Sequence, residues 1–174
     1  RHAQSREVLE RLERSKHIGA AEKSLCELVF SRIERDAGNI ALSRAHLQKS
    51  ISLATVARDA ERLCCAQLPL ALLLADQAGP EAARTLLAEV RSGAMKLGNP
   101  HVSAALHLTV GELDAKRGLI ATGRRHTQIA QQLLDGSPNL WLQTWAENNL
   151  QAMSILHSDF DGALLHGRRA LQLA

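Results

Sequence analysis

Eight histidines are the residues of this sequence best suited to bind a metal ion or carry protons. His46, His126 and His166 are separated by multiples of 40 residues, although Leu86 takes the remaining place in the series. Positions a whole repeat apart lie too far from one another to share one ion at ~2 Å. No two histidines have the i, i+4 spacing of a zinc site on a helix. We therefore expect no bound metal and no cofactor.

Three cysteines, Cys26, Cys64 and Cys65, offer thiol chemistry. Their number is odd and two are adjacent, so they fit no disulfide framework, and a reducing, cytoplasmic environment is expected. Neighbouring residues on a helix point about 100° apart, and we expect Cys64 and Cys65 to be small buried hydrophobic residues rather than a redox pair.

Catalytic motifs are missing from the sequence. The glycines form neither GxGxxG nor GxxxxGK[ST], and no paired acids, Ser-His-Asp set or Cys-His set can be assembled without arbitrary choices. We expect no enzymatic activity.

Arginines and tryptophans could instead bind a partner. Arg44, Arg84 and Arg124 recur every 40 residues, and Arg125, Arg168 and Arg169 add to the series. A net charge of +3 is small, and no aromatic residue lies between Arg44 and Arg124 for base stacking. A solvated outer face is expected there, and nucleic-acid binding through the arginine column is the alternative.

Trp141 and Trp145 lie one helical turn apart and are followed by Asn148 and Asn149. Aromatic anchors beside amides are typical of a peptide-binding groove. Core packing, or contact with a neighbouring repeat, is the alternative interpretation.

The composition predicts helices to position these residues. Hydrophobic residues make up 45% of the 174 residues and charged residues 22%, whereas aromatic residues reach only 2% and tyrosine is absent. Ala, Leu, Arg, Glu and Gln dominate, and these residues favour helices. No apolar run approaches the ~18 residues of a membrane span. We predict an all-α protein that does not cross a membrane.

A 40-residue period organises the chain. Small residues recur at Ser43, Ala83, Gly123 and Ala163, and at Ser31, Ala71 and Gly111. Residues typical of turns and N-caps recur at Gly19, Asp59, Asn99 and Asn139, and helix breaks at Gly38, Ala78, Gly118 and Ser158. Two helices can approach within ~8 Å only where the side chains between them are small. The period therefore predicts stacked pairs of antiparallel helices.

Nine helices follow from this pattern. Their predicted ranges are 3–16, 20–36, 40–57, 60–77, 80–96, 100–117, 120–134, 138–157 and 160–174. Pro100 and Pro138 are expected at first helical positions. Gln151 falls where a small residue is needed, and a one-residue shift that places Ala152 there is expected.

These positions resemble the tetratricopeptide (TPR) repeat superfamily. The stretches that carry the resemblance are AGNIALSRAHLQKSISLA, AGPEAARTLLAEV and SDFDGALLHGRRALQLA. The usual repeat is about 34 residues, and the longer period here is similar to helical repeat regions of bacterial signalling proteins and transcription regulators. The residues of a carboxylate clamp are absent, because Leu28, Arg32, Leu68 and Leu72 stand at its sites.

The resemblance implies a right-handed superhelical solenoid in residues 1–174, expected to be one domain and a fragment of a larger protein. It would contain an orphan helix at 1–17 and repeats at about 20–57, 60–97, 100–135 and 138–174. The implied function is a protein-interaction scaffold in a bacterial transcription or signalling protein, with an effector pocket inside the superhelix as an alternative.

The first helices of the pairs are expected to line a concave, accessible face that binds a protein or peptide partner. The residues expected on it are Arg32, Cys65, Leu68, Leu72, Glu112, Trp145 and Asn148. Self-association through the terminal helices is also expected, since the last one ends in Leu171, Leu173 and Ala174.

Overall fold

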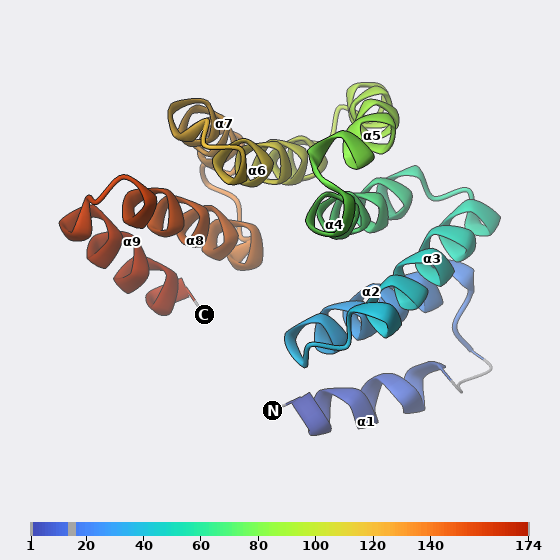
Figure 1. Cartoon of the computed structure of the whole chain (residues 1–174). Coiled ribbons are helices and arrows are strands. Elements are labelled where there is room, and N and C mark those ends of the chain that lie inside the picture. The colour runs from blue at the N-terminus through green and yellow to red at the C-terminus, as the bar shows by residue number, and fades with distance from the viewer. Residues whose placement is uncertain (1, 14–16, 174) are drawn as a thin grey trace. The chain divides into compact units, whose positions relative to one another are not determined.

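The computed structural model of the chain describes residues 2–13 and 17–173, which contain nine α-helices, one short 3₁₀-helix and no strand (Figure 1). The predictions of an all-α fold and of nine helices are confirmed. Residues 1, 14–16 and 174, which we assigned to the first and last helices, lie outside the described residues. The chain divides into two compact units, Arg1–Gly93 and Ala94–Ala174. The single continuous domain and the right-handed superhelix stay predictions.

The first unit consists of one lone helix and two helix pairs. Its helices are α1 (His2–Glu13), α2 (Ala20–Asp36), α3 (Ile40–Ala57), α4 (Ala60–Ala78), the 3₁₀-helix η1 (Pro80–Ala83) and most of α5 (Arg84–Leu97). Helix α2 packs along α3, and α4 packs against α2, α3 and η1. Leu47, Leu68 and Ala54 are almost inaccessible to solvent and belong to the core of this unit.

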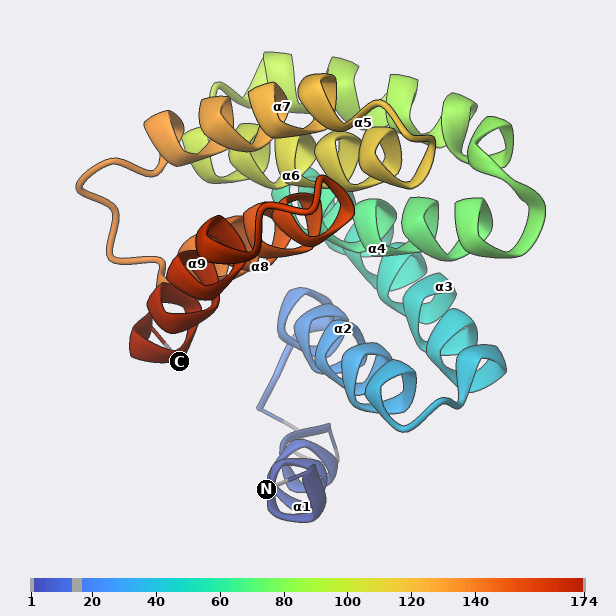
Figure 2. The same ribbon diagram turned by 60° about the vertical axis from the view of Figure 1, so that its left-hand side comes forward.

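The second unit contains two further pairs. Its helices are α6 (Pro100–Lys116), α7 (Ile120–Leu133), α8 (Leu140–Leu156) and α9 (Phe160–Leu173). Helices α6 and α7 lie side by side, as do α8 and α9 (Figure 2), and α8 packs against both helices of the preceding pair. Leu108, Leu134 and Met153 belong to its core.

The first helix of every pair begins at the predicted cap residue. Gly19, Asp59, Asn99 and Asn139 are the N-caps of α2, α4, α6 and α8. The side chains of Asp59, Asn99 and Asn139 each accept a hydrogen bond from a backbone N–H in the first turn, at 2.9–3.1 Å. These bonds satisfy donors that a helix leaves unpaired at its start.

Two local predictions were wrong. Pro138 is not the first residue of α8, because Asn139 caps a helix that starts at Leu140, while the Ser137 hydroxyl accepts from the backbone N–H of Asn139 at 3.1 Å. The shift to Ala152 does not occur either, since Ala152 is exposed. Gln151 keeps its place because Gly167 on α9 leaves room for it; a Cβ on Gly167 would lie 2.8 Å from the Gln151 amide nitrogen.

The columns of small residues occupy the contacts between helices, as predicted. Ser43, Ala83, Gly123 and Ala163 are all buried. The predicted turns are present as well: Gly38 and Gly118 have φ angles of 82° and 80°, which glycine adopts at little cost. Among the residues that the structure describes, no helix is long and apolar enough to cross a membrane.

Candidate functional site

The repeated histidines contact residues of the preceding helix instead of one another. His46 Nδ1 lies 2.6 Å from Glu27 Oε2, and His166 Nδ1 lies 2.7 Å from Glu147 Oε2. Glu27 is buried and also forms an ion pair with Lys49. The same contact therefore recurs after 120 residues, once in each unit, and holds the second helix of a pair to the first.

The third histidine of this column contacts another histidine. His126 Nδ1 lies 2.8 Å from His107 Nδ1, at the position that corresponds to Glu27 and Glu147. The other ring nitrogen of His126 is 4.0 Å from Asp114 Oδ2. Within the described part of the chain, no three His, Cys, Asp or Glu side chains could hold a metal ion together. The expectation that the protein binds no metal stays a prediction.

Burial keeps the adjacent cysteines in the thiol form. Desolvation raises the pKa of Cys64, and it raises the pKa of Cys65 to about 11, with a smaller contribution from the Glu61 carboxylate. Cys64 is buried, and its sulfur would lie 2.9 Å from a Cβ on Gly93 of α5. A reactive thiol needs a lowered pKa, so the structure favours packing over redox chemistry for this pair.

In the first unit, the residues predicted for the concave face separate into two groups. Leu68 and Leu72 are only 1% and 4% exposed. The prediction that they are accessible was wrong, because α4 packs against α2, α3 and η1 and uses these leucines as core. Arg32 is exposed and Cys65 is half-buried. These leucines therefore cannot contact a partner while the unit is folded.

In the second unit, the predicted residues remain accessible to different degrees. Asn148 is exposed, and Glu112 and Trp145 are half-buried. Glu112 forms an ion pair with Lys116 at 3.0 Å. The rings of Trp145 and Trp141 lie 5.4 Å apart between centroids, and Trp141 is 49% exposed. Solvent therefore reaches the indole pair on α8 mainly at Trp141.

Two arginines of the column, Arg44 and Arg124, contact the next helix pair. Arg124 on α7 is half-buried, and its Nη2 donates to the Ser154 hydroxyl on α8 at 3.1 Å. Arg44 on α3 donates to the Gln77 side chain on α4 at 3.4 Å. The expected solvated face is present at Arg44, Arg84, Arg125, Arg168 and Arg169, which are exposed. Arg124 is half-buried, because α7 also touches the first helix of the following pair.

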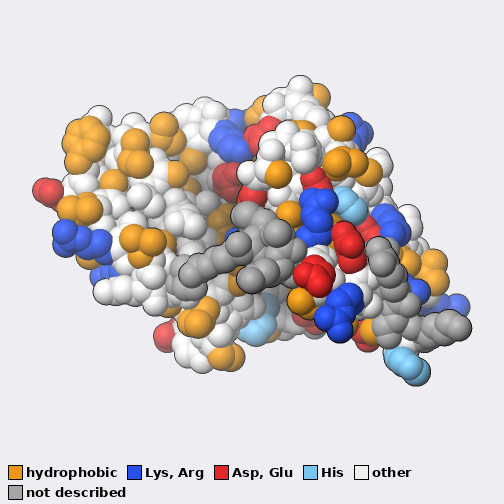
Figure 3. Space-filling view, turned by 90° about the horizontal axis from the view of Figure 1, so that it is seen from below, with side chains coloured by type: hydrophobic (Ala, Val, Ile, Leu, Met, Phe, Trp, Pro, Cys, Tyr) orange, Lys and Arg blue, Asp and Glu red, His pale blue; other side chains and the backbone are white. Residues whose placement is uncertain are grey.

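An open hollow lies between α8 and α9. The residues that line it are Thr144, Asn148, Gln151, Leu164, Gly167, Arg168, Ala170 and Leu171. Leu164 and Leu171 are 55% and 80% exposed. The space-filling view in Figure 3 shows hydrophobic side chains gathered over α8 and α9, on the left, with only a few charged ones between them. We call this feature the α8/α9 groove.

Sequence reasoning placed Asn148 on a binding face but missed the other residues of the α8/α9 groove. The signal was present in the 40-residue period. Leu164 and Leu171 continue the columns of Arg124 and Gln131, two residues that contact α8. Extending those columns by one period would have predicted a leucine-lined edge.

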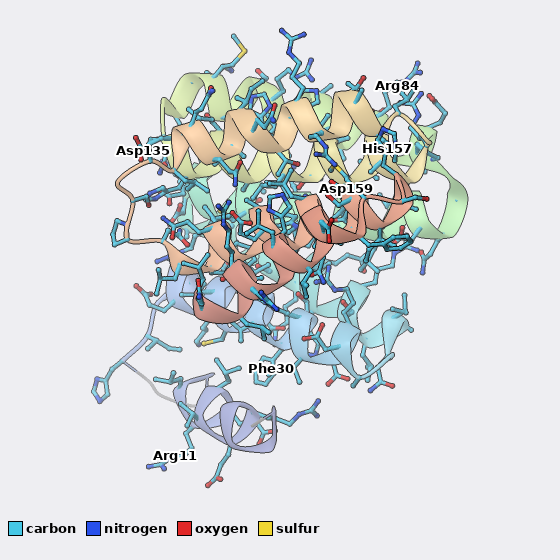
Figure 4. The ribbon with its side chains drawn as sticks, turned by 90° about the vertical axis from the view of Figure 1, so that its left-hand side faces the viewer. Arg11, Phe30, Arg84, Asp135, His157 and Asp159 are labelled. Atoms are coloured by element: carbon cyan, nitrogen blue, oxygen red, sulfur yellow. The ribbon has the colours of Figure 1, made fainter. Side chains whose placement is uncertain are left out.

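A second hollow in the same unit lies where α7 meets the turn between α8 and α9. Its lining residues are Ile120, Ala121, Arg124, His157, Ser158 and Asp159. His157 and Asp159 lie close together in that turn (Figure 4). Asp159 Oδ1 accepts from the backbone N–H of Gly162 at 2.9 Å and so caps α9. Arg124 and Asp159 in this hollow thus each have a structural partner.

Comparison with known proteins indicates the fold alone. No protein-family model and no curated protein matches the chain. The crystal structure of BtubC (BKLC) from P. vanneervenii is similar, with a TM-score of 0.59 over 98% of this chain and 70% of that chain. Sequence identity is 14%. The likeness therefore concerns the helical arrangement and carries no function by itself.

Proposed function

We propose that this chain is a protein-interaction scaffold of the TPR kind, and that it forms the regulatory repeat region of a larger bacterial signalling or transcription protein. The observation that carries the proposal is the α8/α9 groove, where Leu164 and Leu171 stand exposed beside Asn148. Clustered apolar side chains on a folded surface typically mark an interaction site.

The remaining chemistry of the molecule supports binding rather than catalysis. Desolvation raises the pKa of Cys64 and of Cys65, which favours their thiol form. The buried acids Glu27 and Glu147 are occupied by histidines of the neighbouring helix. These groups stabilise helix pairs. We therefore expect the chain to act by binding a partner through a complementary surface.

Photo-crosslinking tests this function directly. A photoreactive amino acid at Asn148 or Leu164 should capture a discrete protein from extracts of the source organism, and the purified partner should then bind the chain saturably. The matched control places the same probe at Leu165, an exposed residue outside the lining of the groove. Capture that is equal at Leu165, or no saturable binding, would contradict the proposal.

Binding of a small effector is the second candidate function. The hollow at Arg124, His157 and Asp159 supports it, because it brings a guanidinium, an imidazole and a carboxylate to one opening. A thermal-shift screen of small anionic metabolites tests it. A shift that Arg124→Gln abolishes would favour an effector, and no shift with any compound would remove this candidate.

Nucleic-acid binding receives less support. Arg44 and Arg124 contact Gln77 and Ser154, and Arg84 forms an ion pair with Glu81 at 2.6 Å. These contacts direct three members of the column toward protein groups rather than toward phosphates.

A further inference from the structure

One repeated contact between the two helices of a pair has a different chemistry in the pair α6–α7. In α2–α3 and α8–α9 this contact joins an acid to a base, as Glu27 with His46 and Glu147 with His166. In α6–α7 the acid is replaced by His107, so that two imidazoles face each other. This pair of helices is therefore held by two bases where the other two pairs have a carboxylate and a base.

The geometry of the contact between His107 and His126 leaves room for a proton. The two Nδ1 atoms are 2.8 Å apart, and the ring centroids are 5.1 Å apart. That centroid separation is about the largest that the distance between the nitrogens permits, so each Nδ1 points directly at the other. A metal ion between two opposed nitrogens would need bonds of ~2 Å to each, and hence a separation of about 4 Å. One ring thus donates an Nδ1–H to the bare Nδ1 of the other.

The number of protons on the two rings decides whether this contact can form. With both rings neutral, one Nδ1–H lies between the two nitrogens. A first added proton goes to Nε2 of the donating ring, which leaves the contact in place and turns it into a charge-assisted hydrogen bond. A second added proton must occupy the accepting Nδ1, so that two N–H groups and two positive charges would meet at 2.8 Å. The doubly charged rings therefore have to separate.

The charged side chains with contacts around this pair come from α6, α7 and α8. They are Asp114, Arg117, Arg124 and Glu147. Asp114 Oδ2 lies 4.0 Å from Nε2 of His126 and favours a positive charge on that ring, although Arg117 also pairs with Asp114 at 3.8 Å. On α8, which packs against both helices, Glu147 already accepts from Gln131. Asp114 can therefore compensate one positive charge on the pair but not two.

We propose that His107 and His126 form a pH-sensitive latch, in which one shared proton holds α6 to α7 and protonation of both rings releases them. Histidine changes its charge between pH 5 and 8. The released rings bind one proton more than the singly charged closed pair. Acidification therefore raises the ratio of open to closed pairs by up to about tenfold per pH unit. This inference goes beyond the scaffold function and does not depend on it.

Release of the latch should loosen the second unit before the first. Helix α8 packs against α6 and α7, and Arg124 and Gln131 on α7 bond to Ser154 and Glu147 on α8. Separation of α6 from α7 therefore weakens the support of α8. In the acid–histidine pairs, protonation of the imidazole places a positive charge beside a carboxylate and strengthens the contact. Mild acid should thus open α6–α7 while α2–α3 stays closed.

Hydrogen–deuterium exchange of the whole chain at several pH values tests the latch. Protection factors correct each amide for the effect of pH on its intrinsic exchange rate. Between pH 7.5 and pH 5.5 they should fall at least about tenfold in α6 and α7, and less than about threefold in α2 and α3. No fall in α6 and α7, or an equal fall in both pairs, would overturn the proposal.

Matched variants assign the response to these two rings. His107→Glu gives α6–α7 the acid–histidine pair that α2–α3 already has, and it should abolish the fall in protection. His157→Gln removes an exposed histidine from the turn between α8 and α9 and should leave the fall within about twofold of the wild-type value. Circular dichroism at pH 7.5 should show both variants folded. A fall in His107→Glu as large as in the wild type would refute the latch.

Nitrogen NMR of the wild-type chain tests the shared proton without any substitution. Two-bond ¹H–¹⁵N spectra at pH 7.5 report how far the Nδ1 atom of each imidazole is protonated. The two rings together should account for one Nδ1 proton, either held by one ring or divided between both. No Nδ1 proton, or one on each ring, would show that the rings share none, and the latch would be wrong.

Discussion

Gly111 on α6 and Gly123 on α7 face each other so closely that neither position has room for a side chain. A Cβ on Gly123 would lie 2.6 Å from the carbonyl oxygen of Gly111, and a Cβ on Gly111 would lie 2.9 Å from that of Gly123. Both obstacles are backbone atoms, which cannot move aside as the end of a flexible side chain can. The contact brings the two helices together near the turn that joins them.

Substitution of Gly123 should therefore destabilise the second unit. We expect Gly123→Leu to lower the free energy of unfolding by about 1–3 kcal/mol, because overpacking forces the helices apart. Thr122→Leu, one residue away and exposed, should change it by less than about 0.5 kcal/mol. Urea denaturation of both variants measures the difference. Equal stability would show that the α6–α7 contact is not tight.

A buried acid should contribute more than an exposed one. Glu27→Ala removes the partner of His46 and Lys49 inside the α2–α3 pair, and we expect a loss of roughly 1–3 kcal/mol. Glu81→Ala removes an ion pair with Arg84 that is largely exposed and should cost less than about 1 kcal/mol. Similar losses in thermal or urea unfolding would contradict this ranking.

Cys65 should react slowly despite being only half-buried. With its pKa raised to about 11 from 9.0, its thiolate fraction at pH 8 falls about 100-fold. Alkylation by iodoacetamide should therefore be slow at pH 8 and accelerate as the pH approaches 11. Tandem mass spectrometry can assign the adduct. Ser92→Cys supplies an exposed thiol for comparison, and equal rates at the two sites would refute the expectation.

Acid should weaken the packing around Glu34. The pKa of this carboxyl lies below 4.5, first because the Asn39 amide donates to it at 2.8 Å and also because Arg6 pairs with it. Its contribution to stability is fully present above pH 4.5 and is lost as the pH falls through the lowered pKa. The gap in unfolding free energy between wild type and Glu34→Gln should narrow from pH 6 to pH 3. A gap that stays constant would exclude this linkage.

Much of the fold follows from local signals repeated in phase. Asp59, Asn99 and Asn139 cap their helices through their own side chains, so counting by 40 was enough to find them. The helix start predicted at Pro138 was wrong because Ser137 and Asn139 can both cap a helix. The proline pointed to Ser137 as the cap, whereas the 40-residue period points to Asn139, the cap that the structure shows. The prediction for Gln151 was wrong because the room for its side chain comes from Gly167 on α9. A column of equivalent positions on the first helices contains no information about a residue on the partner helix.

The candidate surface was harder to predict than the helices. Leu68 and Leu72 have the spacing of an exposed apolar face, yet they are buried by the packing of α4 against three other elements. Burial of a side chain depends on contacts between helices that are distant in the sequence. The spacing of apolar residues within one helix gives no information about those contacts. The 40-residue period points to the leucines of the α8/α9 groove, and the packing of α8 against α6 and α7 shows what the equivalent surface does one pair earlier.

The capping residues that begin the first helix of every pair also bear on how such a chain changes during evolution. Because each pair starts with its own cap and follows the previous one after 40 residues, a gene that gains or loses one such segment keeps every start signal and every contact column in phase. Recombination can therefore alter the number of pairs without redesigning any of them. The leucine-lined groove at α8 and α9 would be carried along intact.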